Sequence, residues 1–377
     1  MQKTMDKFLE ELRGKAKDYP ELMDLFVTCY TNTLDTTVKR MENNTTHVIT
    51  GDIPAMWLRD SAAQLRQYIF LAKEDEEIRE LIAGLVRRQF MYINIDEYAN
   101  AFNHSASGDC WEKDDPNQSP WVWERKFEID SLCYPIQLAY LLWKNADCVT
   151  QFNEDFQKGV EKILEVFHTE QYHEEKSSYR FNRNNGYYRD TLSRDGKGAL
   201  VKSGTGLIWS GFRPSDDACT YGYLIPSNMF AVVVLGYVQE IFAALNLADS
   251  ESIIADAKRL QAEIQEGIEN YAYTTNSKGE KIYAFEVDGL GNASIMDDPN
   301  VPSLLAAPYL GYCDVNDEVY QATRRTILSP ENPYFYQGEY ASGLGSSHTF
   351  YRYIWPIALS IQGLTTTDKA EKKHLLD

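Results

Sequence analysis

Cysteine is scarce in this sequence and is not arranged in pairs. The 377 residues include six cysteines, and none of them shows a CxxC spacing. A structural zinc site and a disulfide framework are therefore not expected. We expect most of the cysteines to be small buried residues in a reducing cytoplasm.

Long apolar runs and an excess of basic residues are also missing. No apolar run reaches the roughly 18 residues that a membrane span needs, and residues 1–19 are charged, without the apolar core of a signal peptide. The 37 basic residues are outnumbered by 56 acidic ones, which gives a net charge of −19. Such a chain repels nucleic acid and anionic lipid. We therefore expect a monomeric cytoplasmic protein with a neutral substrate.

What the sequence does contain is apolar and aromatic material. Hydrophobic residues make up 44% of the chain, which is enough for a large core and excludes disorder. The chain has 25 Tyr, 16 Phe and 7 Trp residues, and much of this aromatic material must belong to the core. Aromatic faces also stack on the C–H surfaces of sugars, so this stock is compatible with a carbohydrate site.

Helical patterns recur in pairs along the chain. A segment that is apolar on every side is followed by one with a single apolar stripe, which is typical of a buried helix beside an exposed one. The pairs are 132–143 with 149–168 and 226–246 with 250–271, with further pairs near 302–328 and from 352 onward. Before them, 57–72 shows the helical spacing of one buried face and is followed by a second helical segment at 75–93. This rhythm predicts one all-α domain over residues 1–377, an (α/α)6 barrel with an inner and an outer ring of helices. A flat helical solenoid is the alternative.

The connections between these helices include predicted hairpins and one long loop. Three segments read as β-hairpins, at 38–50, 178–190 and 273–287. Residues 97–127 form a long polar segment with no clear element, and loops of that length in a compact domain are often functional. We expect the loops to build a pocket at one end of the barrel.

Five loop stretches that precede the apolar helices carry the candidate site residues. TGDIPAMWLRDSAAQ (50–64) places Trp57, Arg59 and Asp60 at the start of a helix, where a simple salt bridge is the alternative to sugar binding. GFRPSDDACTY (211–221) contains Arg213 and the adjacent acids Asp216 and Asp217. Adjacent carboxylates repel, so one can hold the proton that a glycosidase acid donates. Helix capping is the alternative role for either acid.

The other three stretches have weaker signals. IMDDPNVPSL (295–304) holds Asp297 and Asp298, for which capping is the stronger alternative. PWVWERKFEID (120–130) contains Glu124 and Arg125, and GEYASGLGSSHTFYRYI (338–354) contains His348. A lone histidine is usually structural. The sequence has no P-loop, GxGxxG, HExxH or Ser-His-Asp signature, so a polar pocket without phosphate or metal chemistry is expected.

Taken together, these motifs resemble a known family. The segments TGDIPAMWLRDSAAQ, WERKFEIDSLCYP, SGFRPSDDAC, GYLIPSNMF, MDDPNVPSLL and GLGSSHT resemble glycoside hydrolase family 125 over about residues 20–365. The resemblance implies an (α/α)6 barrel and exo-acting α-1,6-mannosidase activity with inversion. It also implies that no metal or cofactor is required.

The resemblance assigns roles to several residues. The general acid matches Asp216 or Asp217, and the spacing does not distinguish the two. Arg59 and Asp60 would bind hydroxyls of the terminal mannose beside Trp57, while Arg125, Arg213 and His348 are weaker candidates for the same pocket.

The family's general base has no match in these residues. It is the glutamate of an MHESF-type loop after the last outer helix, whereas this sequence ends at KKHLLD. Glu339 and Glu124 lie in suitable loops, but neither is at the family's base position. We therefore expect a C-terminally incomplete domain whose base lies outside residues 1–377. Turnover without a base should be slower by about two to four orders of magnitude.

Two other functions remain open at this point. A mannoside-binding protein would keep the pocket and lack the base. A sugar epimerase or isomerase on the same barrel type would need paired histidines, for which only His348 and His104 are placed.

Overall fold

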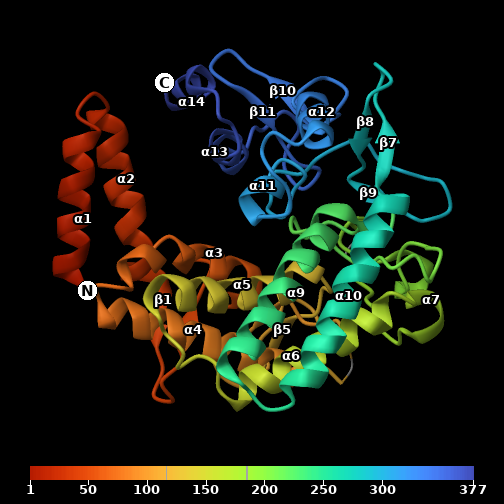
Figure 1. Ribbon diagram of the computed structural model, residues 1–377, viewed down its shortest axis with the longest axis horizontal. Coiled ribbons are helices and arrows are strands. Elements are labelled where there is room, and N and C mark those ends of the chain that lie inside the picture. Colours follow the sequence, from red (N-terminus) through yellow and green to blue (C-terminus); the bar gives the residue numbers. More distant parts are fainter. Residues whose placement is uncertain (116, 184–185) are drawn as a thin grey trace. The chain divides into compact units, whose positions relative to one another are not determined.

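Helices dominate the structure, and the strands are only two or three residues long (Figure 1). The structure is a computed structural model that describes residues 1–115, 117–183 and 186–377. Its secondary structure agrees with the predicted all-α class. The closure of the helices into an (α/α)6 barrel stays a prediction.

The chain divides into two compact units. The first comprises residues 1–125 and 134–163, and the second comprises residues 126–133 and 164–377. The division runs through α5 (Ile129–Ala146) and α6 (Glu154–Glu170), each of which contributes residues to both units. The prediction of one domain over the whole chain stays a prediction.

The first unit combines helices with two small antiparallel sheets. Its elements are α1 (Gln2–Lys15), α2 (Pro20–Asn32), the π-helical turn η1 (Thr33–Thr37), β1 (Val38–Arg40), β2 (Thr46–Val48), β3 (Met56–Trp57), α3 (Leu58–Arg66), the 3₁₀ turn η2 (Ile69–Leu71), α4 (Glu76–Ile95), β4 (Ala101–Phe102) and β5 (Val122–Glu124). Asp75 caps α4 by accepting a hydrogen bond from the Ile78 backbone N–H at 3.1 Å. The single helix expected over 57–72 is interrupted, since α3 ends at Arg66 and η2 begins at Ile69. The fully buried Tyr68 lies between them and donates its hydroxyl to the Tyr30 carbonyl.

The second unit contains the remaining elements. They are α7 (His173–Lys176), α8 (Ser193–Gly196), β6 (Tyr223–Leu224), α9 (Ile225–Leu245), α10 (Ser250–Tyr271), β7 (Tyr273–Thr275), β8 (Lys281–Tyr283), β9 (Glu286–Val287), α11 (Ala307–Leu310), α12 (Glu318–Ile327), β10 (Phe335–Gln337), β11 (Ser342–Leu344), α13 (Pro356–Leu364) and α14 (Lys369–Leu376). The first member of the helix pair expected near 302–328 is therefore a single turn, α11.

The pair α9 and α10 follows the predicted pattern of a buried helix beside a striped one. The two helices lie side by side (Figure 1), and Gln261 of α10 donates to the Val232 carbonyl of α9 at 2.7 Å. The stripe of α10 is buried at Ile253, Ala257, Leu260, Ile264 and Ile268. The apolar faces of this pair therefore supply a large share of the core of the second unit.

By length and composition, α9 could also cross a membrane, which the sequence argument did not anticipate. It has 21 residues, and half of its most apolar 18-residue window is buried inside the protein. A mostly buried core helix passes the same test. Ser227 and Asn228 near its start are fully buried and hydrogen-bonded within the second unit, which is the behaviour of a core helix.

Two of the three predicted hairpins are present. In the 38–50 hairpin, β1 pairs with β2 with Val38 opposite Val48, and in the 273–287 hairpin, β7 pairs with β8 with Tyr273 opposite Tyr283. For 178–190, residues 184–185 at the turn lie outside the described residues, and the described flanks are not strands. Residues 97–127 do contain elements, because β4 and β5 join β3 in a three-stranded sheet.

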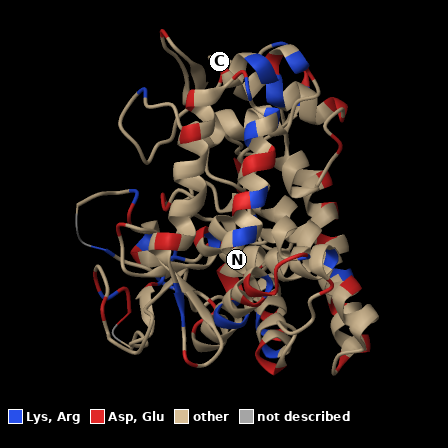
Figure 2. Cartoon of the chain, turned by 90° about the vertical axis from the view of Figure 1, so that its left-hand side faces the viewer, with Lys and Arg blue, Asp and Glu red and all other residues tan. Residues whose placement is uncertain are grey.

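Charge and cysteine placement partly follow the sequence analysis. Acidic and basic residues are interspersed along the helices and loops (Figure 2). All six cysteines are free, but only Cys133, Cys148 and Cys219 are buried, while Cys29 is exposed. The expectation that most cysteines are buried is thus correct for half of them.

Candidate active site

The loop that carries the adjacent acids is closed tightly by its own backbone. The Arg213 N–H donates to the Asp217 carbonyl at 2.9 Å, and the Asp216 N–H donates to the Arg213 carbonyl at 2.9 Å. The backbone of Asp216 has a φ of 69°, in the left-handed region that residues other than glycine rarely adopt. Such backbone strain concentrates at functional sites. The loop therefore presents the two neighbouring carboxyl groups in different directions and environments.

Asp217 is the more constrained of the two acids. Its side chain is 1% exposed, and it accepts hydrogen bonds from Ser347 Oγ at 2.5 Å and from His348 Nδ1 at 3.1 Å. Arg189 Nε lies 3.9 Å from the same carboxylate. These contacts hold the Asp217 carboxyl group in one orientation. Asp216 is half-buried instead, and its carbonyl accepts from Lys126 Nζ at 3.1 Å.

A buried ion pair holds the ends of this loop. Arg213 Nε lies 2.6 Å from Glu286 Oε1, and Glu286 also accepts from the backbone N–H groups of Thr220 and Tyr221 at 3.0 Å each. Burial alone would lower the pKa of Arg213, but the charge and hydrogen bond of Glu286 outweigh it and raise that pKa. Arg213 is thus committed to Glu286 and also donates to Ser347 Oγ at 3.2 Å. Its role in this structure is to organise the loop.

Asp297 and Asp298 are both fully buried. Asp297 accepts from the backbone N–H groups of Leu304 and Leu305 at 2.8 and 2.9 Å, so it caps the turn before α11, as the alternative interpretation stated. Burial raises the pKa of Asp297 to about 7. Because neither side chain is exposed in this structure, neither reaches a ligand in this conformation. Their substrate-binding role stays a prediction.

Asp298 links two loops of the second unit through serine hydroxyls. It accepts from Ser215 Oγ at 2.8 Å and from Ser346 Oγ at 3.1 Å. Ser346 and Ser347, adjacent in the chain, therefore bind Asp298 and Asp217 respectively. This places the GLGSSHT segment directly against the loop of the candidate acids.

A cavity of about 390 Å³ lies beside this loop. Its lining includes Tyr188, Arg189, Arg213, Thr220, Met296 and Tyr334. Residues 191–193 and 198–199 also line it. The lining mixes polar, apolar and tyrosine side chains and includes no carboxylate, which is suited to a neutral polyhydroxylated ligand.

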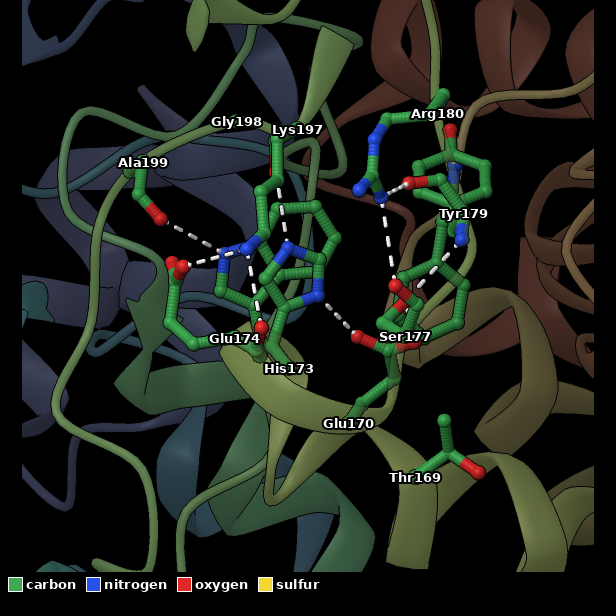
Figure 3. Close-up of polar contacts among 12 residues, drawn as sticks. Thr169, Glu170, His173, Glu174, Ser177, Tyr179, Arg180, Lys197, Gly198 and Ala199 are labelled. Atoms are coloured by element: carbon green, nitrogen blue, oxygen red, sulfur yellow. Dashed lines mark hydrogen bonds and ion pairs between the residues drawn. The ribbon is translucent and has the colours of Figure 1, made fainter.

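Figure 3 shows the network that contacts part of this lining. His173 is fully buried, and its Nδ1 lies 2.5 Å from Glu170 Oε2 while its Nε2 donates to the Lys197 carbonyl at 2.8 Å. The His173 ring stacks on Trp209 with 3.6 Å between centroids. Trp209 Nε1 donates to the Ala199 carbonyl at 3.2 Å. The segment at 197–199 is thus fixed at two of its carbonyls.

In the first unit, the predicted Arg59–Asp60 salt bridge is present. Arg59 Nη1 and Asp60 Oδ2 are 2.8 Å apart, and the side chain of Asp60 is 34% exposed. The salt-bridge alternative is therefore correct as geometry. It does not exclude sugar binding, because Asp60 remains accessible beside Trp57, which precedes α3.

Glu124 and Arg125 are held by neighbours in the first unit. Glu124 is buried and accepts from Asn100 Nδ2 at 2.9 Å. Arg125 Nε lies 2.7 Å from Asp96 Oδ2, and its backbone N–H donates to Asp114 at 2.7 Å. Their substrate contacts stay predictions. In the described part of the chain, no group of three or more His, Cys, Asp or Glu side chains could hold a metal ion.

Several residues of this constellation were not singled out from the sequence. Ser347 lies inside the GLGSSHT motif, so its position next to His348 was a usable signal. Glu286 and Arg189 gave none, because each is distant in sequence from Asp217 and only the folded chain brings them to the loop.

Substituting His348 by glutamine should remove a pH-dependent contribution to stability. The hydrogen bond to Asp217 raises the pKa of His348 above its ordinary value of 6.5. The pair therefore stabilises the fold fully below that value and is lost as the pH rises through the raised pKa. Urea midpoints of wild type and H348Q should differ most near pH ~5.5 and converge near pH ~9.

The exposed His374 of α14 provides the matched control, since H374Q removes a histidine without an Asp217 partner. Its midpoint should follow that of the wild type at both pH values. A difference between wild type and H348Q that is equal at both pH values would contradict the assignment.

Comparison with known proteins decides the class of this site. The sequence matches the family model of metal-independent α-mannosidases over residues 19–377. The chain belongs to glycoside hydrolase family 125. The family resemblance inferred from the motifs is thereby confirmed, and the enzyme is an α-mannosidase.

Two relatives of this family 125 chain cover all of it. The meiotically up-regulated gene 157 protein of Schizosaccharomyces pombe is 38% identical over 402 residues, which include 77% of that protein. A metal-independent α-mannosidase from Streptococcus pneumoniae is 67% identical in sequence and has a TM-score of 0.98. The match covers 88% of the pneumococcal chain. That structure holds α-1,6-mannobiose in a non-productive complex.

Proposed function

We propose that this enzyme removes terminal α-1,6-linked mannose from oligosaccharides, acting from the chain end on an (α/α)6 barrel. The observation that carries the proposal is the match of the whole chain to the pneumococcal α-mannosidase that holds α-1,6-mannobiose, at 67% identity. The cavity lined by Arg213 and Thr220 of the acid loop, with Tyr188 and Tyr334 in its walls, supports it. A neutral sugar also suits a chain with a net charge of −19.

The proposed mechanism is hydrolysis with inversion. A carboxylic acid protonates the leaving oxygen, while a carboxylate base activates water on the opposite face of the sugar. We assign the acid to Asp216, since Asp217 is buried and already bonded to Ser347 and His348, whereas Asp216 is only half-buried. Asp217 would then position the loop and stabilise positive charge as it develops on the sugar ring.

Arg59 and Asp60 are proposed to hold hydroxyls of the terminal mannose. An arginine donates and a carboxylate accepts, so the pair reads two neighbouring hydroxyls at once. The partial exposure of Asp60, 34% of its side chain, supports this role. Trp57 would form part of the wall.

The direct test is mannose release from α-1,6-mannobiose by the 377-residue chain, with binding measured in parallel by calorimetry. Release confirms the hydrolase. Binding without release favours the alternative, a mannoside-binding protein with the same pocket. If the chain neither releases mannose nor binds mannobiose, the proposal is overturned.

Asp60→Ala tests the sugar contact within the same assay. We expect mannose release, or mannobiose affinity, to fall at least tenfold, because a buried ligand hydroxyl loses a charged acceptor. The melting temperature should change little, since a partly exposed ion pair contributes little to stability. Equal losses of activity and stability would support a purely structural salt bridge.

A further inference from the structure

One exposed tryptophan stands out in the first unit. All seven tryptophans lie in the described residues, and among them only Trp111 is exposed, at 58%. A single exposed aromatic residue is ordinary on a protein surface. The case for Trp111 therefore rests on what it touches and on how its segment is held.

The segment that carries Trp111, described over residues 103–115 and 117–121, is held by hydrogen bonds at its base. The Asn103 N–H donates to the Trp121 carbonyl at 2.8 Å, and Asn103 Nδ2 donates to the Asp109 carbonyl at 2.8 Å. The Tyr92 hydroxyl donates to the Asn103 carbonyl at 2.6 Å. The fully buried Arg88 of α4 donates to the His104 carbonyl. Trp111 thus projects from a segment with a fixed base.

A β-bulge brings Trp123 to the same face as Trp57. Ala101 of β4 pairs with both Trp57 and Glu124, whereas Phe102 pairs with Val122, so Trp123 is the extra residue on β5. Bulges redirect side chains and are frequent beside active sites. As a result, Trp57 and Trp123 share one apolar cluster with Ala55 and Ala101.

Trp111 contacts this cluster edge-on. Its ring centroid is 5.6 Å from that of Trp123, with an angle of 72° between the ring planes. Offset and edge-on aromatic pairs are favourable. The contact positions Trp111 next to the cluster and leaves much of its ring open to solvent.

The two buried tryptophans each have an N–H group without an acceptor. Trp57 is 5% exposed and Trp123 is 8% exposed, and neither Nε1 has a hydrogen-bond partner in the described residues. Buried donors in native proteins are nearly always paired, so two unpaired donors in one cluster need an explanation. Ligand hydroxyls are acceptors that would pair them.

We propose that Trp111, Trp123 and Trp57 form a subsite for a third hexose ring of the substrate glycan, beyond the two rings of a disaccharide such as α-1,6-mannobiose. The C–H face of that ring stacks on Trp111, and its hydroxyls accept from the indole N–H groups. The inference rests on the proposed mannoside function and extends it. The preferred substrates would be α-1,6-linked oligosaccharides longer than a disaccharide.

The test compares binding of α-1,6-mannobiose and α-1,6-mannotriose by calorimetry. Wild type should bind the trisaccharide roughly tenfold more tightly than the disaccharide, as expected for one added aromatic–sugar contact. W111A should lose most of that ratio, and W111F, which keeps an aromatic face, should retain part of it. In an active enzyme the same ratio should appear in KM, more than in kcat.

Phe70→Ala provides the matched control. Phe70 is 50% exposed and also contacts another ring edge-on, at 4.8 Å from Phe8. F70A should keep the wild-type ratio. An unchanged ratio in W111A overturns the subsite, as does an equal loss for both sugars with a lower melting temperature.

The outcomes separate the subsite from the proposed function. Trp111-dependent trisaccharide binding without mannose release would overturn hydrolysis and leave the subsite. Mannose release that W111A does not affect would support hydrolysis and overturn the subsite. A wild-type chain that binds neither sugar overturns both.

Discussion

Asp216→Asn is expected to lower mannose release from α-1,6-mannobiose by about two to four orders of magnitude, the usual worth of a general acid. The reason is that the sugar leaving group is a poor one and needs a proton. Asp216 is half-buried on a left-handed backbone, with a φ of 69°, so its carboxyl group is the one of the pair that can approach a ligand.

The leaving group of the substrate distinguishes the two acids. On 2,4-dinitrophenyl α-mannoside, whose leaving group needs no proton, D216N should recover most of its loss. D217N should be impaired to a similar degree on both substrates, because Asp217 positions the loop through Ser347 and His348. The opposite pattern would assign the acid to Asp217. Both variants should remain folded by circular dichroism.

Glu286→Gln is expected to reduce the free energy of unfolding by about 3–5 kcal/mol, as when one partner of a buried ion pair is removed. Glu286 is fully buried, and its partner Arg213 is 4% exposed. The substitution keeps the shape of the side chain but leaves the arginine charge buried without compensation. Denaturant unfolding of wild type and E286Q measures the difference.

The same substitution should lower activity, because Glu286 also holds the Thr220 and Tyr221 N–H groups at the end of the acid loop. Glu280→Gln is the matched control, since it removes a carboxylate that pairs with Arg325 at 2.9 Å on the surface. Its unfolding midpoint should stay close to that of the wild type. An E286Q midpoint that also stays there would contradict a structural role for the Arg213–Glu286 pair.

Several helices were predictable because helical periodicity depends on local sequence. The stripe of α10 and the all-apolar pattern of α9 follow from helical periodicity, which places residues three and four apart on one face. The hairpins at 38–50 and 273–287 follow from their turn residues. The two-residue strands β3 and β4 were missed because they are too short for a period-two pattern. Only pairing with each other and with β5 defines them.

The candidate site also has features that the local sequence predicts and features that only the folded chain defines. The acids of the 211–221 stretch, the Arg59–Asp60 pair and His348 are recognisable from the sequence, because each lies in a short motif of characteristic composition. Their environments were not recognisable. Asp216 and Asp217 are adjacent and chemically identical, and what distinguishes them is contact with Ser347 and His348, more than a hundred residues away.

By itself, the sequence determined the helical class, the family and the short motifs that carry the chemistry. The tertiary structure decided which carboxylates are buried, which arginine is committed to Glu286, and that a bulge turns Trp123 onto the face of Trp57. The physical reason is that hydrogen bonds, burial and pKa shifts arise between side chains that are neighbours in space. Periodicity and composition report only on neighbours along the chain.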